Sequence, residues 1–180
     1  MGYAQRILPN YTYDDYIHWE GRWELIEGIP HAMAPLPVPK HQRIASALNY
    51  EFVSAIKKSK CKHCFVYEPL DYKVAEDTVI QPDVLVVCGK INKKFLDFPP
   101  SLVVEILSPS TALKDRHTKF GIYETNCVKY YIIVDVDKEL FEVYKLIEGK
   151  YAAVEIDLKE PINFILEDGC SINVSFSDVW

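Results

Sequence analysis

An acidic residue stands in the middle of a strand-length apolar segment, Leu102–Leu107, whose sequence is Leu-Val-Val-Glu-Ile-Leu. A short run rich in valine, isoleucine and leucine predicts a buried strand. Glutamate is rarely buried unless it is paired or bound to a metal, because removing its charge from water is costly. The fold must therefore give Glu105 a metal ion or a lysine or arginine partner, or leave it at a strand edge that faces water.

A second carboxylate introduces another predicted strand. Asp83 follows Pro82 and directly precedes the apolar run Val84–Val87. Two carboxylates from adjacent strands can bind a divalent cation through oxygen ligands. Such a cation can generate hydroxide from water and stabilise charge on a phosphoryl oxygen. Asp83 and Glu105 are therefore candidate ligands for a cation with this chemistry, while a salt bridge to a lysine or arginine, or a strand edge that faces water, remains the alternative for Glu105.

The remaining pattern alternates helices with groups of strands. Thr12–Asp15 opens a short helix, and Arg22–Ala34 predicts a β-hairpin around Glu27-Gly28. Apolar residues recur every four positions in Lys40–Lys58, which predicts a long amphipathic helix. The other predicted elements are strands at Phe65–Tyr67 and Asp71–Val74, a helix at Thr111–Asn126, a hairpin of Lys129–Val136 with Glu139–Leu146, and strands at Tyr151–Ile156 and Phe164–Leu166.

This order predicts an α/β (α+β) fold with a central mixed β-sheet flanked by helices and an N-terminal β-hairpin. The length of 180 residues suits one domain over residues 1–180. No apolar run approaches the roughly 20 residues that span a bilayer. The first ten residues lack the apolar core of a signal peptide, so we expect a cytoplasmic protein without membrane contact.

Five cysteines, at positions 61, 64, 88, 127 and 170, raise the question of disulfides or zinc. An odd number in a chain without an export signal favours reduced thiols. Cys61 and Cys64 form a Cys-x-x-Cys pair, but a structural zinc site needs four ligands and no second pair follows. Thiols are therefore the expected state, and metal analysis would decide. No glycine-rich phosphate loop occurs, so we expect no organic cofactor.

Several motifs together resemble the Uma family of restriction-endonuclease-like proteins, within the PD-(D/E)XK nuclease superfamily. The resemblance extends from about Tyr13 to Leu146. Its most specific segment is Glu105–Thr111, with the sequence Glu-Ile-Leu-Ser-Pro-Ser-Thr. The supporting segments are Trp23–Gly28 in the first hairpin, Pro39–His41 at the start of the long helix, Gln81–Val84, and Lys129–Asp135.

The resemblance implies a restriction-endonuclease-like fold and an endonuclease that hydrolyses DNA. It implies that Asp83, Glu105 and the backbone carbonyl of Ile106 hold Mg²⁺ or Mn²⁺. It also implies a homodimer. Glu24 is implied as a further acidic residue near the metal, and His41 as a supporting or phosphate-contacting group.

One position departs from the superfamily pattern. A lysine is expected two residues after the glutamate, on the same strand face, but Leu107 occupies that position. Related nucleases supply this lysine from the following helix. Lys119 is the candidate, since it shares a helical face with Asp115 and Tyr123. The alternative for Lys119 is a surface ion pair with Asp115.

The net charge of −6 argues against extensive non-specific contact with nucleic acid. Together with Leu107 it favours the alternative that the chain is a catalytically degenerate nuclease-fold module, which binds nucleic acid or a protein partner. A purely structural oligomerisation domain is a third possibility.

Overall fold

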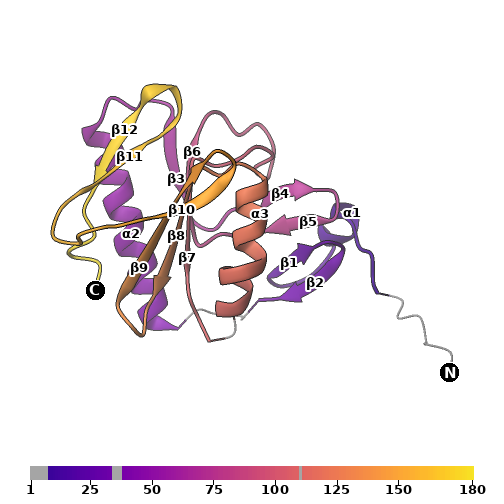
Figure 1. The fold of residues 1–180 in the computed structure, drawn as a ribbon. Coiled ribbons are helices and arrows are strands. Elements are labelled where there is room, and N and C mark those ends of the chain that lie inside the picture. Colours follow the sequence, from indigo (N-terminus) through magenta and orange to yellow (C-terminus); the bar gives the residue numbers. More distant parts are fainter. Residues whose placement is uncertain (1–7, 34–37, 110) are drawn as a thin grey trace.

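The computed structural model describes residues 8–33, 38–109 and 111–180. A six-stranded mixed sheet forms its centre, with strands in the order β10-β9-β8-β7-β6-β3. Helix α2 covers one face of this sheet and helix α3 covers the other (Figure 1). The predicted central mixed sheet flanked by helices is therefore confirmed. Residues 1–7, which carried most of the signal-peptide argument, and Ser110 of the Glu105–Thr111 motif lie outside the described residues.

The predicted N-terminal hairpin is present. It follows a short helix, α1 (Tyr13–Tyr16), and consists of β1 (Trp23–Ile26) and β2 (Ile29–Ala32). Glu27 and Gly28 both have positive φ, 49° and 76°, as a tight two-residue hairpin turn requires. Strands β4 (Tyr72–Ala75) and β5 (Thr78–Ile80) extend this hairpin into a second sheet of order β2-β1-β5-β4.

The long helix α2 (Pro39–Lys58) begins at a proline, which is tolerated in the first turn because its missing N–H has no helical partner there. Ile44, Leu48 and Phe52 are fully buried and form the apolar stripe that the four-residue spacing predicts. They pack on the sheet face formed by even-numbered residues of β6 and β7, such as Val84 and Val104. This packing fixes the start of α2 near the end of β7.

Six strands form the central sheet. Their bounds are β3 (Cys64–Tyr67), β6 (Val84–Cys88), β7 (Leu102–Ile106), β8 (Tyr130–Asp135), β9 (Leu140–Ile147) and β10 (Lys150–Val154). Strands β7 and β8 pair in parallel, and the other neighbours pair antiparallel. The parallel pair requires a crossover, which the helical segment between the two strands supplies.

That helical segment differs from the predicted regular helix. Its middle is a π-helix, η1 (Lys114–Lys119), which continues into α3 (Phe120–Thr125). A π-helix has i→i+5 hydrogen bonds and wider turns than an α-helix, and such turns are often found at functional sites. Apolar periodicity alone does not reveal the change. The element was thus predicted correctly, but not its geometry.

A two-stranded ribbon completes the chain beside α2 (Figure 1). It consists of β11 (Ile162–Ile165) and β12 (Ser171–Val174), joined through a 3-10 turn, η2 (Glu167–Gly169). Phe164 of the ribbon and the following Phe176 lie 6.3 and 6.0 Å from the ring of Phe52 in α2. These aromatic contacts attach the ribbon to the core on the α2 side of the sheet.

The expectation of reduced thiols is wrong for four of the five cysteines. Disulfides join Cys61 to Cys170 and Cys64 to Cys88, and Cys127 is free and exposed. The sequence separations are 109 and 24 residues, so the partners are neighbours only after the sheet and the C-terminal ribbon have formed.

Among the described residues, no helix combines the length and the apolarity needed to cross a membrane.

Candidate functional site

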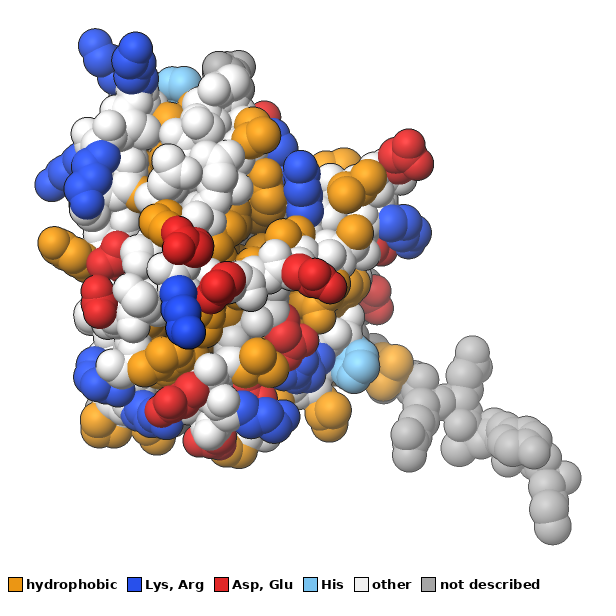
Figure 2. Space-filling model, turned by 60° about the vertical axis from the view of Figure 1, so that its left-hand side comes forward, with side chains coloured by type: hydrophobic (Ala, Val, Ile, Leu, Met, Phe, Trp, Pro, Cys, Tyr) orange, Lys and Arg blue, Asp and Glu red, His pale blue; other side chains and the backbone are white. Residues whose placement is uncertain are grey.

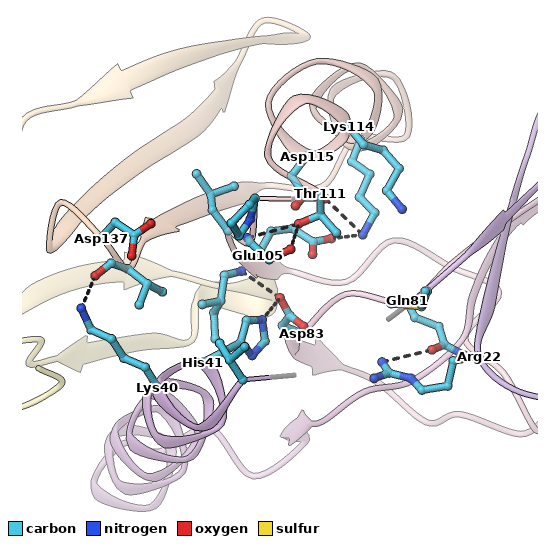
Figure 3. A pocket seen from close by; sticks show the side chains of 18 residues that line it. Arg22, Lys40, His41, Gln81, Asp83, Glu105, Thr111, Lys114, Asp115 and Asp137 are labelled. Atoms are coloured by element: carbon cyan, nitrogen blue, oxygen red, sulfur yellow. Dashed lines mark hydrogen bonds and ion pairs between the residues drawn. The ribbon is translucent and has the colours of Figure 1, made fainter. Parts of the chain in front are cut away.

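The strand register brings the two predicted carboxylates together. Val84 pairs with Val104 across the antiparallel β6–β7 ladder, so continuing the register by one residue sets Asp83 opposite Glu105. Both then belong to the face that α3 covers, because alternate residues of a strand share a face. Directly opposite residues have Cβ atoms about 5 Å apart. Asp83 and Glu105 line the same pocket (Figure 3).

Glu105 is almost completely buried and has two internal donors. Its side chain is 3% exposed, and its Oε1 atom lies 2.9 Å from the Lys119 ammonium. The Tyr123 hydroxyl donates to the same Oε1 atom over 2.6 Å. Tyr123 is itself fully buried behind the carboxylate. The helix that follows the strand therefore offsets part of the cost of burying the Glu105 charge.

Glu24 of β1 is a second fully buried carboxylate, and it joins the N-terminal sheet to this network. Its Oε1 atom lies 2.7 Å from the Lys119 ammonium and accepts a 3.1 Å hydrogen bond from the backbone N–H of Gln81. Its Oε2 atom pairs with the ammonium of Lys114. One lysine thus bridges Glu24 and Glu105, and a second lysine stabilises Glu24 from the other side.

Asp83 lies at the more open side of the site, with 19% of its side chain exposed. Its Oδ2 atom accepts a 2.8 Å hydrogen bond from the backbone N–H of Ile106 and lies 3.3 Å from Nε2 of His41. Burial lowers the pKa of His41, but the hydrogen bond and the charge of Asp83, together with the backbone of Ile106, raise it by more, so the net shift is upward. His41, near the start of α2, therefore helps to orient the Asp83 carboxylate.

Asp115 adds a fourth carboxylate, which is 2% exposed. Its Oδ1 atom accepts no hydrogen bond from the described part of the chain, and the Lys119 ammonium lies 3.5 Å from it. Lys119 is equally buried, so its interpretation as part of a surface ion pair with Asp115 is wrong. A buried carboxylate oxygen without a hydrogen bond marks a place where a cation or a donor is missing from the network.

The pKa shifts follow this crowding of acids. Burial raises the pKa of the Glu105 carboxyl well above its usual range; Lys119 opposes the rise, and Asp115 adds to it. Burial lowers the pKa of the Lys119 ammonium, but the surrounding carboxylates, led by Glu105, raise it well above normal. For Glu24, the attraction of Lys119 and Lys114 outweighs burial and lowers the pKa to about 2. Lys119 is therefore a permanent cation at neutral pH.

The π-helical turn explains how Lys114 and Lys119 reach the same carboxylate. In an α-helix, residues five apart point in directions that differ by about 140°, because each residue turns the helix by about 100°. In the wider π turn, residues five apart are joined by the repeating hydrogen bond and point in more similar directions. Both ammonium groups can then contact Glu24.

The pocket in front of this network has a volume of about 430 Å³. Arg22, beside Gln81, and Lys40, at the start of α2, line it from opposite sides (Figure 3). Both donate to neutral acceptors: Arg22 to the Gln81 side chain at 3.5 Å, and Lys40 to the backbone carbonyl of Val136 at 2.7 Å. The pocket therefore combines acidic groups at its base with basic groups at its sides.

All six side chains predicted for the site are brought together. Asp83, Glu105, Lys119 and His41 line the pocket, and Glu24 and Tyr123 support it from behind. Leu107, at the usual lysine position, also lines the pocket. Sequence reasoning did not identify Lys114, Arg22 or Lys40 as residues of the site. Lysine and arginine are common on protein surfaces, so their presence gave no signal. The π turn and the packing of β1 and α2 against the sheet bring these three side chains to the pocket.

The donor chemistry fits a hard divalent cation, although no complete cage is preformed. Within the described residues, no three histidine, cysteine, aspartate or glutamate side chains are arranged to hold a metal ion. Mg²⁺ commonly binds through one or two carboxylates together with water and substrate phosphates. Asp83 and Glu105 supply two such carboxylates, and Asp115 lines the same pocket. Ile106 contributes its backbone N–H to Asp83; the predicted metal-binding role of its carbonyl stays a prediction.

Comparisons with known proteins agree with this fold. The sequence profile of the Uma2 family, described as "Putative restriction endonuclease", matches residues 12–176. An uncharacterised protein of Synechocystis sp. is 28% identical over 145 residues, which cover 76% of this chain and 75% of that protein. The crystal structure of a "putative nuclease belonging to DUF820" from Anabaena variabilis has a TM-score of 0.68 at 19% identity, covering 84% of this chain and 87% of that one. The structural likeness shows a shared fold.

Proposed function

Since the chain belongs to the Uma2 family, we propose that it is a divalent-metal-dependent endonuclease that hydrolyses DNA phosphodiester bonds in the pocket of Asp83 and Glu105. The observation that carries the proposal is the meeting of these two carboxylates, 22 residues apart in sequence, on one sheet face beside a buried lysine. A structural salt bridge would need one carboxylate for one lysine. Here three carboxylates surround Lys119, those of Glu24, Glu105 and Asp115. Asp83 lines the same pocket, and in the described part of the chain it has no lysine partner of its own.

The charge balance supports a divalent cation. Glu24, Asp83, Glu105 and Asp115 carry four negative charges when ionised, and Lys114 and Lys119 carry two positive charges. At the base of the pocket, apart from Arg22 and Lys40 at its sides, the excess is therefore two negative charges, which one Mg²⁺ or Mn²⁺ would neutralise. Buried charges of one sign are costly unless they are neutralised. Without a cation, uptake of protons by the acids is the remaining route, as the raised pKa values of Glu105 and Asp115 indicate.

Asp83 and Glu105 would hold the metal, which supplies an activated water and stabilises charge on the phosphoryl oxygens. Tyr123 and His41 keep the two carboxylates in place through their hydrogen bonds. Lys119 stays protonated because of its raised pKa, so we assign it to orienting the attacking water and stabilising the scissile phosphate rather than to removing a proton.

DNA would be bound by the basic side chains around the pocket rather than by the whole surface. Arg22, Lys40 and Lys114 line the pocket and can contact phosphates next to the scissile bond. On the face shown in Figure 2, acidic and basic side chains are interspersed, with no continuous basic stripe. The net charge of −6 is consistent with a contact confined to the pocket and its rim. The homodimer that the family resemblance implies would present two pockets, one for each strand of a duplex.

Plasmid cleavage tests the proposal. Supercoiled DNA incubated with the full chain and Mg²⁺ or Mn²⁺ should be nicked or linearised, and a chelator should stop the reaction. Asp83→Asn and Glu105→Gln should each reduce the rate by more than about a hundredfold, since even residues that only support metal ligands contribute 10- to 100-fold. The exposed residues Asp14 and Glu20 provide matched controls, Asp14→Asn and Glu20→Gln, which should cut at the parental rate.

Thermal unfolding of each variant must show a folded protein. A folded Glu105→Gln variant that cuts at the parental rate would refute the assignment of the site. Linear products formed in a single binding event would support two cooperating pockets, and exclusively nicked products would argue for one.

A second candidate is a binding module without catalysis. The observation that favours it is that Glu105 Oε1 already has two internal donors, Lys119 and Tyr123. Such a module would bind DNA with the same affinity in Mg²⁺ and in chelator, and would leave the plasmid uncut. An endonuclease would show metal-dependent cleavage with the parental chain and metal-dependent stabilisation against heat.

A further inference from the structure

Four cysteine sulfurs gather at one place remote from the acidic pocket. Cys61 lies between α2 and β3, Cys64 begins β3, Cys88 ends β6, and Cys170 precedes β12. Cys61 is bonded to Cys170 and Cys64 to Cys88, and the sulfurs of Cys64 and Cys170 are 3.7 Å apart. The two disulfides are therefore in contact with each other and form one cluster of four sulfurs.

The cluster contains four of the five cysteines and is largely enclosed by the protein. Cys61 and Cys64 are 6% and 2% exposed, and the other two members are partly buried. The fifth cysteine, Cys127, is exposed and takes no part in it. The members come from three segments that are distant in sequence: the connection from α2 into β3, the end of β6, and the C-terminal ribbon.

The same four side chains match the ligand set of a structural zinc site. Such sites use four thiolates in a tetrahedron, with a Cys-x-x-Cys pair as a common component. A Zn–S bond of about 2.3 Å separates sulfurs across a tetrahedral edge by about 3.8 Å. The separation of Cys64 and Cys170 is 3.7 Å, although no bond joins these two sulfurs. Cys61 and Cys64 supply the Cys-x-x-Cys pair, which sequence alone left without partners.

The local charge also favours thiolates. Lys60 and Lys62 flank Cys61 in the sequence, and Lys57 and Lys58 end α2 shortly before it. Basic side chains gather at the upper end of the molecule, where α2 ends (Figures 1 and 2). Neighbouring lysines lower the cost of ionising a thiol, and they offset the double negative charge of a zinc ion bound by four thiolates.

We propose that Cys61, Cys64, Cys88 and Cys170 bind one Zn²⁺ when the two disulfides are reduced. Each disulfide accepts two electrons and two protons from a dithiol, which becomes a disulfide itself, and the four thiols release their protons on binding Zn²⁺. Zinc and the disulfides are then alternative cross-links that use the same sulfurs. In the oxidised form the sulfurs are bonded in pairs, and within the described residues no group is ready to hold a metal.

The role of this zinc would be structural. Four protein ligands leave no open position for water or substrate. The ion would attach the C-terminal ribbon, through Cys170, to the strands that carry Cys64 and Cys88. Asp83 lies at the opposite end of β6, five residues from Cys88, or ~17 Å along the strand at about 3.3 Å per residue. The zinc site and the proposed nuclease site can therefore fail independently.

Metal binding by the full chain tests this inference. The protein is reduced without oxygen by a phosphine, freed of metal, and titrated with Zn²⁺ against a chromophoric chelator. One zinc per chain is expected, together with a higher thermal midpoint for the zinc-loaded form. Co²⁺ in place of Zn²⁺ should give intense sulfur-to-metal charge-transfer absorption and the visible bands of a tetrahedral site.

Matched cysteine variants locate the site. Cys127→Ser should retain one equivalent of zinc, and Cys64→Ser and Cys170→Ser should each lose tight binding. Asp83→Asn should bind zinc like the parent, whatever its effect on DNA cleavage. Should a serine variant fail to fold, the stoichiometry and cobalt spectrum of the parent and of Cys127→Ser still decide.

The inference would be overturned by a folded, reduced parent that takes up no zinc. A cobalt spectrum without thiolate bands, or equal loss of binding in Cys127→Ser, would overturn it as well. A chain whose disulfides resist the phosphine and that binds no metal has the disulfides as its only cross-links, which is also a refutation.

Discussion

Replacement of Glu24 by glutamine removes the charge that joins the N-terminal sheet to the helix while keeping the shape of the side chain. Glu24 is fully buried and pairs with both Lys114 and Lys119. Its pKa is lowered from 4.5 to about 2 by these lysines against the effect of burial. A shift of this size corresponds to about 3 kcal/mol of folding free energy at neutral pH, at 1.36 kcal/mol per unit. We expect Glu24→Gln to destabilise the chain by about that amount at pH 7.

The pH dependence gives the sharper test. Because the folded-state pKa is depressed, the contribution of Glu24 is present above the unfolded value near 4.5 and is lost as the pH falls toward 2. The difference in unfolding free energy between the parent and Glu24→Gln should therefore shrink to about 1.4 kcal/mol at pH 3. Urea unfolding at several pH values, followed by circular dichroism, measures it.

The exposed Glu20 provides the control, since Glu20→Gln should stay within about 0.5 kcal/mol of the parent throughout. A Glu24→Gln deficit that is the same at pH 7 and pH 3 would refute the reasoning, because it would show that packing rather than charge makes the difference.

Two further predictions concern the support of the site and of the core. Tyr123→Phe removes the 2.6 Å hydrogen bond to Glu105 and should cost about 1–3 kcal/mol in urea unfolding, while the fully buried ring keeps its packing; no change would mean that Lys119 alone satisfies the carboxylate. Phe52→Ala should cost about 3–5 kcal/mol, since the Phe52 side chain of α2 is fully buried and packs against Phe164 and Phe176. Tyr50→Ala, at a position 69% exposed on the same helix, should change stability by less than about 0.5 kcal/mol, and equal costs at the two positions would contradict the packing argument.

The elements that were predictable from sequence are those with strong local signals. Four-residue apolar spacing located α2 to within one residue of its start, and the Glu27-Gly28 pair located the turn of the first hairpin. Strands β5 and β12 were not predicted. Strand β5 has three residues and is defined by its pairing with β1 and β4. Strand β12 has four residues and is defined by its pairing with β11.

The cysteine cluster likewise could not be predicted from local sequence motifs. The Cys61–Cys64 spacing is visible in the sequence, whereas Cys88 and Cys170 are isolated there. The β3–β6 pairing places Cys64 directly opposite Cys88, and the ribbon brings Cys170 to Cys61. A search restricted to paired motifs rejects a four-cysteine site of this kind, because two of its members are supplied by tertiary contacts.

Lys119 takes the place of the lysine that the superfamily pattern expects at position 107, where this chain has leucine. An ammonium group beside Glu105 is what the expected lysine would provide, and it can come from any element that reaches that carboxylate. Lys119 reaches it from the helix, on the face shared with Asp115 and Tyr123 that the sequence indicated. Because the helix contains a π turn, it adds Lys114, which a regular helix would direct elsewhere. Moving the lysine from the strand to the helix therefore leaves Leu107 free to form part of the apolar wall of the pocket, and it joins three carboxylates through one buried cation.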